Sequence, residues 1–224
     1  MPQKLELVVD HYHKTYDLAY RIWEGRNRTF LYLIGTVALA VLVIQYPALG
    51  EFLVKFAVKK GDLPSVSPQT GASPELDGLL EFTSNTLLNA VMLMVIFFLM
   101  SNLLKDTLNI IRLYKYIDGL EREIKHLMDL GPNSVAFTRE SSFYWDNRQH
   151  THVLVKYFYA GMLAILLGVF LILRVSSDLP RNPDWRFTEL PWLAEHLPFL
   201  LDVIIGIPIV ILFVGYAKAS IWSD

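Results

Sequence analysis

Four long stretches that are almost free of charge limit what this chain can fold into. They cover residues 29–48, 82–104, 157–173 and 198–217, and the only charged side chain inside them is Asp202. A helix needs about 20 apolar residues to cross the hydrocarbon of a bilayer, where only a helix or a closed barrel satisfies its own backbone hydrogen bonds. We therefore expect an all-α membrane protein with four transmembrane helices. The composition, 53% hydrophobic and 19% charged, agrees with this class.

The distribution of Lys and Arg predicts how the chain is oriented. Fourteen of its 20 Lys and Arg residues fall in residues 1–28, 105–156 and 218–224, and six fall in residues 49–81 and 174–197. The side richer in Lys and Arg normally faces the cytoplasm. We therefore expect a multi-pass protein of the bacterial inner membrane, with both termini and the middle segment cytoplasmic. The first poorer segment then forms an outer loop, the second an outer hairpin, and the last seven residues a cytoplasmic tail.

Residues 1–28 are predicted to form a cytoplasmic amphipathic helix. Its apolar side chains recur at intervals of three and four and share one stripe: Val8, Tyr12, Tyr16, Ala19 and Trp23. Such a helix is expected to lie on the membrane surface or to pack on the cytoplasmic side of the bundle, and a partner-binding helix is the alternative. Gly25 offers a place for the chain to turn before the first span.

The middle segment, residues 105–156, is predicted to form a cytoplasmic helical hairpin between the second and third spans. The second span meets no strong helix breaker before Leu130, and 131–133 (GPN) is typical of a helix end. The extended helix carries a heptad seam, which buries itself only against another helix. We expect this seam to hold subunits together, and its partner to be the returning helix or the same helix of a neighbour. The seam comprises Ile110, Leu113, Ile117, Leu120, Ile124 and Leu127.

The return arm of this hairpin carries a dense group of polar and aromatic residues: Arg139, Glu140, Tyr144, Trp145, Asp146, Arg148 and His150. A carboxylate or histidine could act as a base there, with an arginine holding an anion. The simpler interpretation is a salt-bridged helix next to the membrane, and we treat the group as a candidate interaction or trigger surface. Arg148 and His152 lie closer in sequence than the Arg and His of HEPN-superfamily ribonucleases, so that pattern is not met.

Other candidate residues give weaker signals. The pairs His11/His13 and His150/His152 are each two residues apart, so on a helix they diverge and do not chelate one metal. Glu121 and Glu123 are expected to be solvated. Gly161 and Gly168, seven residues apart, could form a close helix contact. Asp202 lies either near the outer interface or, in an oligomer, along a polar pathway.

Two parts of the sequence carry recognisable patterns. The first is 11–16 (HYHKTY) with 23–28 (WEGRNR), which leads directly into a span, and the second is 120–123 (LERE) with 137–140 (FTRE) in the hairpin. These features resemble small bacterial membrane proteins of antiviral defence systems, among them SLATT-domain effectors and membrane accessories of CRISPR systems. The resemblance implies an oligomer that perturbs the membrane when triggered. Four spans in place of two depart from the SLATT pattern, and no catalytic residue carries over.

Three classes of function remain at this point. The preferred hypothesis is a non-enzymatic homo-oligomer that forms a pore or perturbs the bilayer as a defence effector. The second is an accessory or scaffolding subunit whose hairpin binds a cytoplasmic protein. The third is a membrane enzyme acting on lipid or nucleotide through the group that contains Glu140 and His150. No phosphate-binding loop, dinucleotide fingerprint, nucleophile elbow or zinc-protease motif is found. No cofactor, metal or direct nucleic-acid binding is therefore expected.

Overall fold

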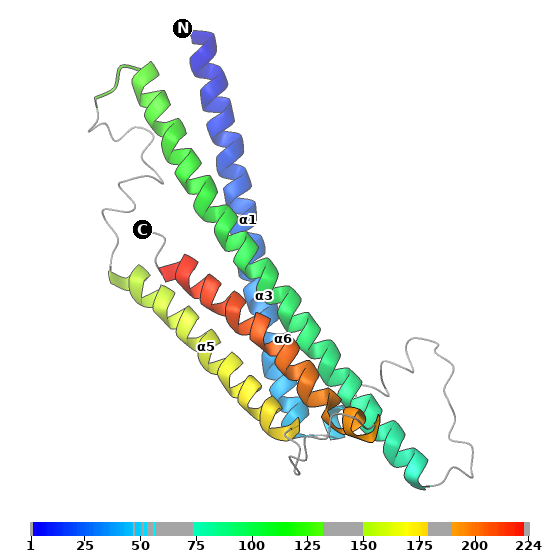
Figure 1. Ribbon diagram of the computed structural model, residues 1–224. Helices are drawn as coiled ribbons and strands as arrows, with labels where there is room; N and C mark the ends of the chain where they lie inside the picture. Colours follow the sequence, from blue (N-terminus) through cyan, green and yellow to red (C-terminus); the bar gives the residue numbers. More distant parts are fainter. Residues whose placement is uncertain are drawn as a thin grey trace. The chain divides into compact units, whose positions relative to one another are not determined.

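Long helices make up almost all of the part of the chain that the structure describes. The structure is a computed structural model, and it describes residues 2–46, 48–50, 52, 56, 74–131, 150–178 and 190–221. Its long helices are α1 (Pro2–Gln45), α3 (Pro74–Leu127), α5 (His150–Asp178) and α6 (Leu190–Ile221) (Figure 1). The described residues contain no strand. All four helices are long and apolar enough to cross a membrane, as the sequence predicts.

The first helix is longer than expected and has no break. α1 runs without interruption from Pro2 to Gln45, so it joins the predicted amphipathic helix to the predicted first span. The turn predicted at Gly25 is therefore wrong. A glycine inside a helix costs about 1 kcal/mol relative to alanine, which favours a break but does not impose one. The helix continues through Gly25 on both sides of it.

α3 extends the second span far beyond its apolar part, and this prediction is confirmed. The helix passes Gly119 and ends at Leu127, before the expected stop at Gly131. The amide of Leu130 donates to the carbonyl of Lys125 at 2.9 Å, and the amide of Asp129 donates to the carbonyl of His126 at 3.3 Å. Asp129 has a φ of 54°, so these bonds form a Schellman cap with an aspartate in the left-handed position. The left-handed residue that caps the helix is therefore Asp129, two residues before Gly131.

The last two helices also extend past the predicted spans. α5 begins at His150, which adds the turns that the short window 157–173 lacked. α6 contains Pro198 and Pro208 inside one helix. The return arm of the predicted cytoplasmic hairpin falls on residues 132–149, outside the described residues.

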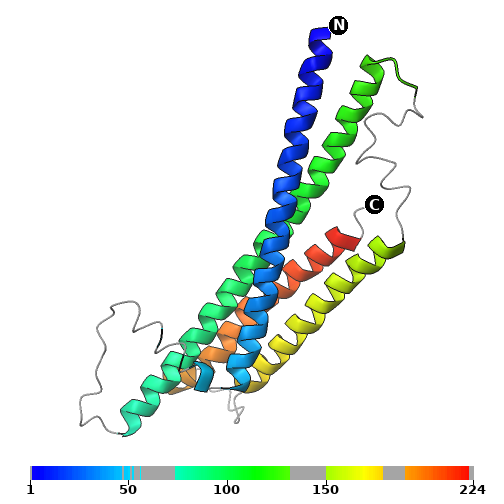
Figure 2. The same ribbon diagram turned by 180° about the vertical axis from the view of Figure 1, so that it is seen from behind.

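The chain divides into two compact units, and each long helix contributes to both. Unit 1 comprises Met1–Leu31, Met100–Met162 and Leu212–Asp224, and unit 2 comprises Tyr32–Leu99 and Leu163–Ile211. Within unit 1 the start of α1 lies beside the end of α3, which is visible from both sides (Figures 1 and 2). Within unit 2 the buried side chains recur at three- and four-residue intervals, as expected for helices that pack on one another. They include Leu33, Val37, Ala40, Leu93, Ile96, Leu163, Leu167, Phe170 and Ile209.

Candidate functional site

An ion pair lies buried in unit 2 between α5 and α6. The Nε of Arg174 donates to Oδ1 of Asp202 at 3.0 Å, and the two side chains are only 5% and 3% exposed. Asp202 is four residues inside the apolar segment Pro198–Ser220, and Arg174 is three residues inside Tyr157–Ser177. A lone charge at such a depth is costly, and pairing with an opposite charge removes much of that cost. Asp202 therefore has a partner inside its own chain.

Sequence reasoning identified only half of this pair. From the sequence, Asp202 is a candidate for a polar pathway, whereas Arg174 is only the first residue of the expected outer hairpin. The useful signal is that both residues lie near the same predicted side of the membrane, at the facing ends of consecutive spans. Opposite charges at matching depth on two helices joined by a hairpin are expected to meet.

One turn further along both helices, α5 and α6 are in van der Waals contact. A Cβ added at Gly206 would lie 3.5 Å from Cδ2 of Leu171. Small residues allow helices in a membrane to pack at short distance. The predicted close contact at Gly161 and Gly168 is not made with the described residues of the same chain, since a Cβ at either position would meet nothing within 4 Å there. Gly206 of α6, by contrast, does face a neighbouring helix.

The heptad seam of α3 packs against α1 in unit 1. Ile117, Leu120 and Ile124 form a buried cluster with Tyr12 and Ala19. Partly buried residues surround this cluster: Leu5, Val8, Val9 and Tyr16 of α1 with Leu113 and Tyr114 of α3. The partner of the seam is therefore the N-terminal helix, which was neither of the two partners considered from the sequence. The amphipathic stripe of α1 and the seam of α3 are two sides of one contact.

A polar contact lies inside this apolar cluster. Glu121 is 1% exposed, and its Oε1 accepts a hydrogen bond from the hydroxyl of Tyr12 at 3.2 Å. The expectation that Glu121 is solvated is therefore wrong. Heptad spacing alone assigns Glu121 to a flank of the seam, but α1 covers that flank as well. Glu123 instead lies outside, where it forms an exposed ion pair with Lys4 at 3.2 Å.

These contacts give α1 and α3 an antiparallel register. Lys4 pairs with Glu123 near the free ends of the helices, and His11 Nε2 lies 2.8 Å from the hydroxyl of Tyr116 further along. Exposed ion pairs contribute roughly 0–1 kcal/mol. Burial of the apolar cluster is therefore the main stabilising term, and the polar contacts fix which residues face each other.

Arg26 lies at the end of this helix pair that adjoins the first apolar stretch. Its side chain is half-buried, and Nη2 donates to Oδ1 of Asn27 at 3.2 Å. Arg26 precedes the window 29–48 by three residues. Burial lowers the pKa of the guanidinium from its ordinary value, and the nearby Tyr216, Tyr114 and Asp106 oppose that change. An arginine nevertheless stays protonated in proteins, so Arg26 is a partly desolvated cation.

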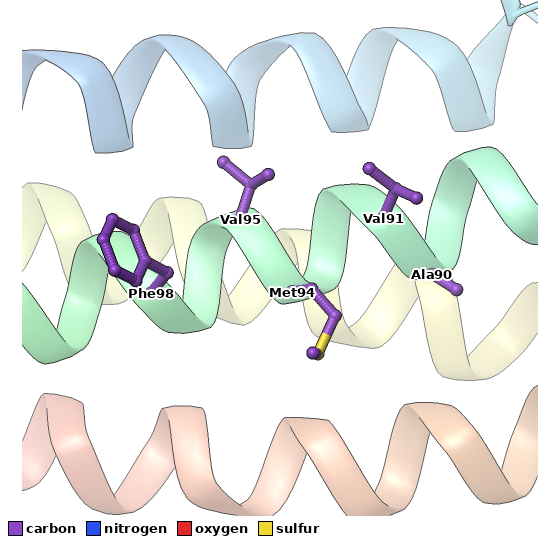
Figure 3. A pocket seen from close by; sticks show the side chains of 5 residues that line it. All are labelled: Ala90, Val91, Met94, Val95 and Phe98. Carbon is purple, nitrogen blue, oxygen red and sulfur yellow. The ribbon is translucent and has the colours of Figure 1, made fainter.

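An apolar hollow lies on the outer face of α3 in unit 2. It has a volume of about 350 Å³ and is lined only by α3 side chains: Ala90, Val91, Met94, Val95 and Phe98 (Figure 3). Met94 and Phe98 are more than half exposed. A surface of this kind in a membrane-spanning helix suits lipid chains or another helix, and it carries no polar group for chemistry.

Most of the predicted interaction or trigger surface lies outside the described residues. Arg139, Glu140, Tyr144, Trp145, Asp146 and Arg148 all belong to residues 132–149, and His150 is the first residue of α5. Among the residues that the structure describes, no group of three or more His, Cys, Asp or Glu side chains could hold a metal ion. The enzyme alternative through Glu140 and His150 therefore stays a hypothesis.

Comparisons with known proteins add no relative to this picture. No family model matches the chain, and neither a curated protein nor a solved structure is similar to it.

Proposed function

We propose that this protein is a non-enzymatic membrane protein that assembles from several copies into a pore or a membrane-perturbing ring. The observation that carries this proposal is how little of each span the chain itself buries. In the most apolar window of each span, only 22% to 28% of the residues are buried. The remaining apolar surface is left for lipid and for neighbouring subunits. Membrane helices associate through close packing of such surfaces.

The buried ion pair favours a conducting path between several copies of the chain and disfavours a path within one copy. Arg174 and Asp202 neutralise each other and are shielded from solvent. An ion pathway needs polar groups that water can reach. In our proposal the pair therefore holds α5 to α6, and any conducting path forms between protomers.

The proposed location is the bacterial inner membrane, with both termini in the cytoplasm. The uneven distribution of Lys and Arg supports this orientation. The proposed role in antiviral defence rests only on the resemblance at residues 11–16, 23–28, 120–123 and 137–140. The seam on α3 remains a proposed subunit contact, and in this structure it is covered by α1 of the same chain.

Two measurements on one sample test the proposal. Light scattering corrected for bound detergent gives the protein mass, which we expect to be a discrete multiple of 25.7 kDa. The same protein in liposomes is expected to release an entrapped dye, and empty liposomes prepared with the same detergent are the control. A monomer that releases no dye would contradict the proposal.

A second candidate function is an accessory or scaffolding subunit that binds a cytoplasmic protein. It is favoured by apolar side chains that α1 exposes outside the first apolar stretch. Leu7 and Leu18 are 69% and 49% exposed, and their eleven-residue spacing places them on one face of the helix. A discrete soluble partner that copurifies and is lost in the variant Leu7→Glu/Leu18→Glu, without dye release by the chain alone, would favour this function. The matched control is Glu6→Gln/Asp10→Asn, which alters exposed polar positions of the same helix.

A further inference from the structure

A row of acidic side chains lies along the exposed side of α1 in unit 1. Asp10, Asp17 and Glu24 are each seven residues apart, so they share one face of the helix, and all three are exposed. Tyr12 and Ala19, which pack against α3, each follow a residue of this acidic row by two positions. Two residues turn a helix by about 200°. The acidic row therefore points away from α3.

A row of basic side chains lies along the exposed side of α3 in the same unit. Its members are spaced by seven, three and seven residues, so they also share one face, and all are exposed: Lys105, Arg112, Lys115 and Arg122. Ile117, which packs against α1, follows Lys115 by two positions. The basic row therefore points away from α1. The helix pair thus presents acids on one outer side and bases on the other.

The polar contacts between α1 and α3 show which residues of the two helices lie level with each other. In the three contacts, the numbers of the two residues add up to 127, 127 and 133. A residue of α1 is therefore level with the residues of α3 whose numbers complete a sum in this range. By this register Asp17 is level with Arg112, and Glu24 is level with Lys105. A symmetry axis along the helix pair preserves these levels, so both pairs of opposite charges can meet between neighbouring copies.

Contacts within the chain leave the centre of both rows open. Asp10 and Glu24 each pair with a cation one turn later on α1. Such exposed pairs along one helix contribute only about 0.3–0.5 kcal/mol, so they do not prevent a carboxylate from facing a second cation. Asp17 and Arg112 form no ion pair within the part of the chain that the structure describes. The two residues that the register places level are therefore both available.

We propose that the acidic row of one copy packs against the basic row of the next copy, with Asp17 facing Arg112 and Glu24 facing Lys105. This inference rests on the proposed assembly from several copies and assigns the cytoplasmic surface through which they meet. Two different faces of one chain form a contact that repeats from copy to copy and closes into a ring when the rotation allows it. A two-fold contact through either row would instead bring like charges together, which is costly.

The charges have a defined task in this contact. Exposed ion pairs contribute roughly 0–1 kcal/mol each, so they do not supply most of the affinity. Complementary charges instead reject wrong partners and fix the register of a contact. The apolar surface of the spans provides the packing, and the two rows select the neighbour and its height.

The test cross-links two differently tagged copies of the full chain that are coexpressed in one membrane. The chain has no cysteine of its own. One copy carries Asp17→Cys and the other carries Arg112→Cys, and a short bis-maleimide is added to the membranes. Helices in contact lie about 8–10 Å apart, so we expect a covalent dimer that contains both tags. The pair Glu24→Cys with Lys105→Cys should give the same product.

The matched control uses the same two faces at the wrong height. Glu24→Cys with Arg122→Cys places the thiols about 20 Å or more apart along the helices, and we expect at least ~5-fold less of the dimer with both tags. Equal cross-linking in this control would show a contact without a fixed register and would overturn the proposal. Dimers between two Asp17→Cys copies in place of the mixed dimer would overturn it in favour of a two-fold contact.

A charge exchange tests whether the charges select the neighbour. Arg112→Glu places two acids together at every contact, so we expect the assembled fraction in light scattering to fall at least ~2-fold. The double variant Asp17→Arg/Arg112→Glu restores opposite charges between copies and should recover assembly. Normal assembly of Arg112→Glu, with no cross-link between residues 17 and 112, would overturn this inference and leave the proposed function standing. A monomeric unmodified chain would overturn both.

Discussion

At the residue scale, the contact between Arg174 and Asp202 makes a measurable prediction. Asp202→Asn and Arg174→Gln each leave one buried charge without its partner, and we expect each to cost about 3–5 kcal/mol of unfolding free energy. The double variant Arg174→Gln/Asp202→Asn removes both charges, so it should cost less than the sum of the two single changes. Chemical unfolding in detergent micelles measures all three. Strictly additive losses would show that the two side chains do not interact energetically.

At the element scale, the contact between α1 and α3 predicts that two variants on different helices behave alike. Ala19→Glu and Ile117→Glu each place a charge in the same buried cluster, and each is expected to destabilise it by several kcal/mol. Limited proteolysis should then cleave α1 in both variants, while Lys14→Glu, at an exposed position of α1, should resist like the unmodified chain. A fall in particle mass for Ile117→Glu alone would show that the seam also joins subunits.

The sequence predicted the helices better than their partners, and the reason is physical. An apolar window or a heptad is a local pattern, so the spans and the continuous helix through Gly119 could be predicted. A pattern shows that a face needs a partner but does not name that partner, and so α1 was missed as the partner of the seam. The burial of Glu121 and the pairing of Arg174 with Asp202 depend on which helices meet. The predicted surface from Arg139 to Arg148 lies outside the described residues and stays a prediction.

At the scale of the whole molecule, the orientation can be tested directly because the chain contains no cysteine. We expect Glu6→Cys to react with a membrane-impermeant maleimide in inverted membrane vesicles but not in intact cells. Thr70→Cys, in the predicted outer loop, should show the opposite pattern. The physical reason is that fourteen of the 20 Lys and Arg residues are predicted to lie on the side of residue 6, and positively charged segments are retained in the cytoplasm. The unmodified chain controls for labelling at other residues. If both cysteines reacted from one side, the number of spans between them would be even, and the first apolar stretch would not cross the membrane alone.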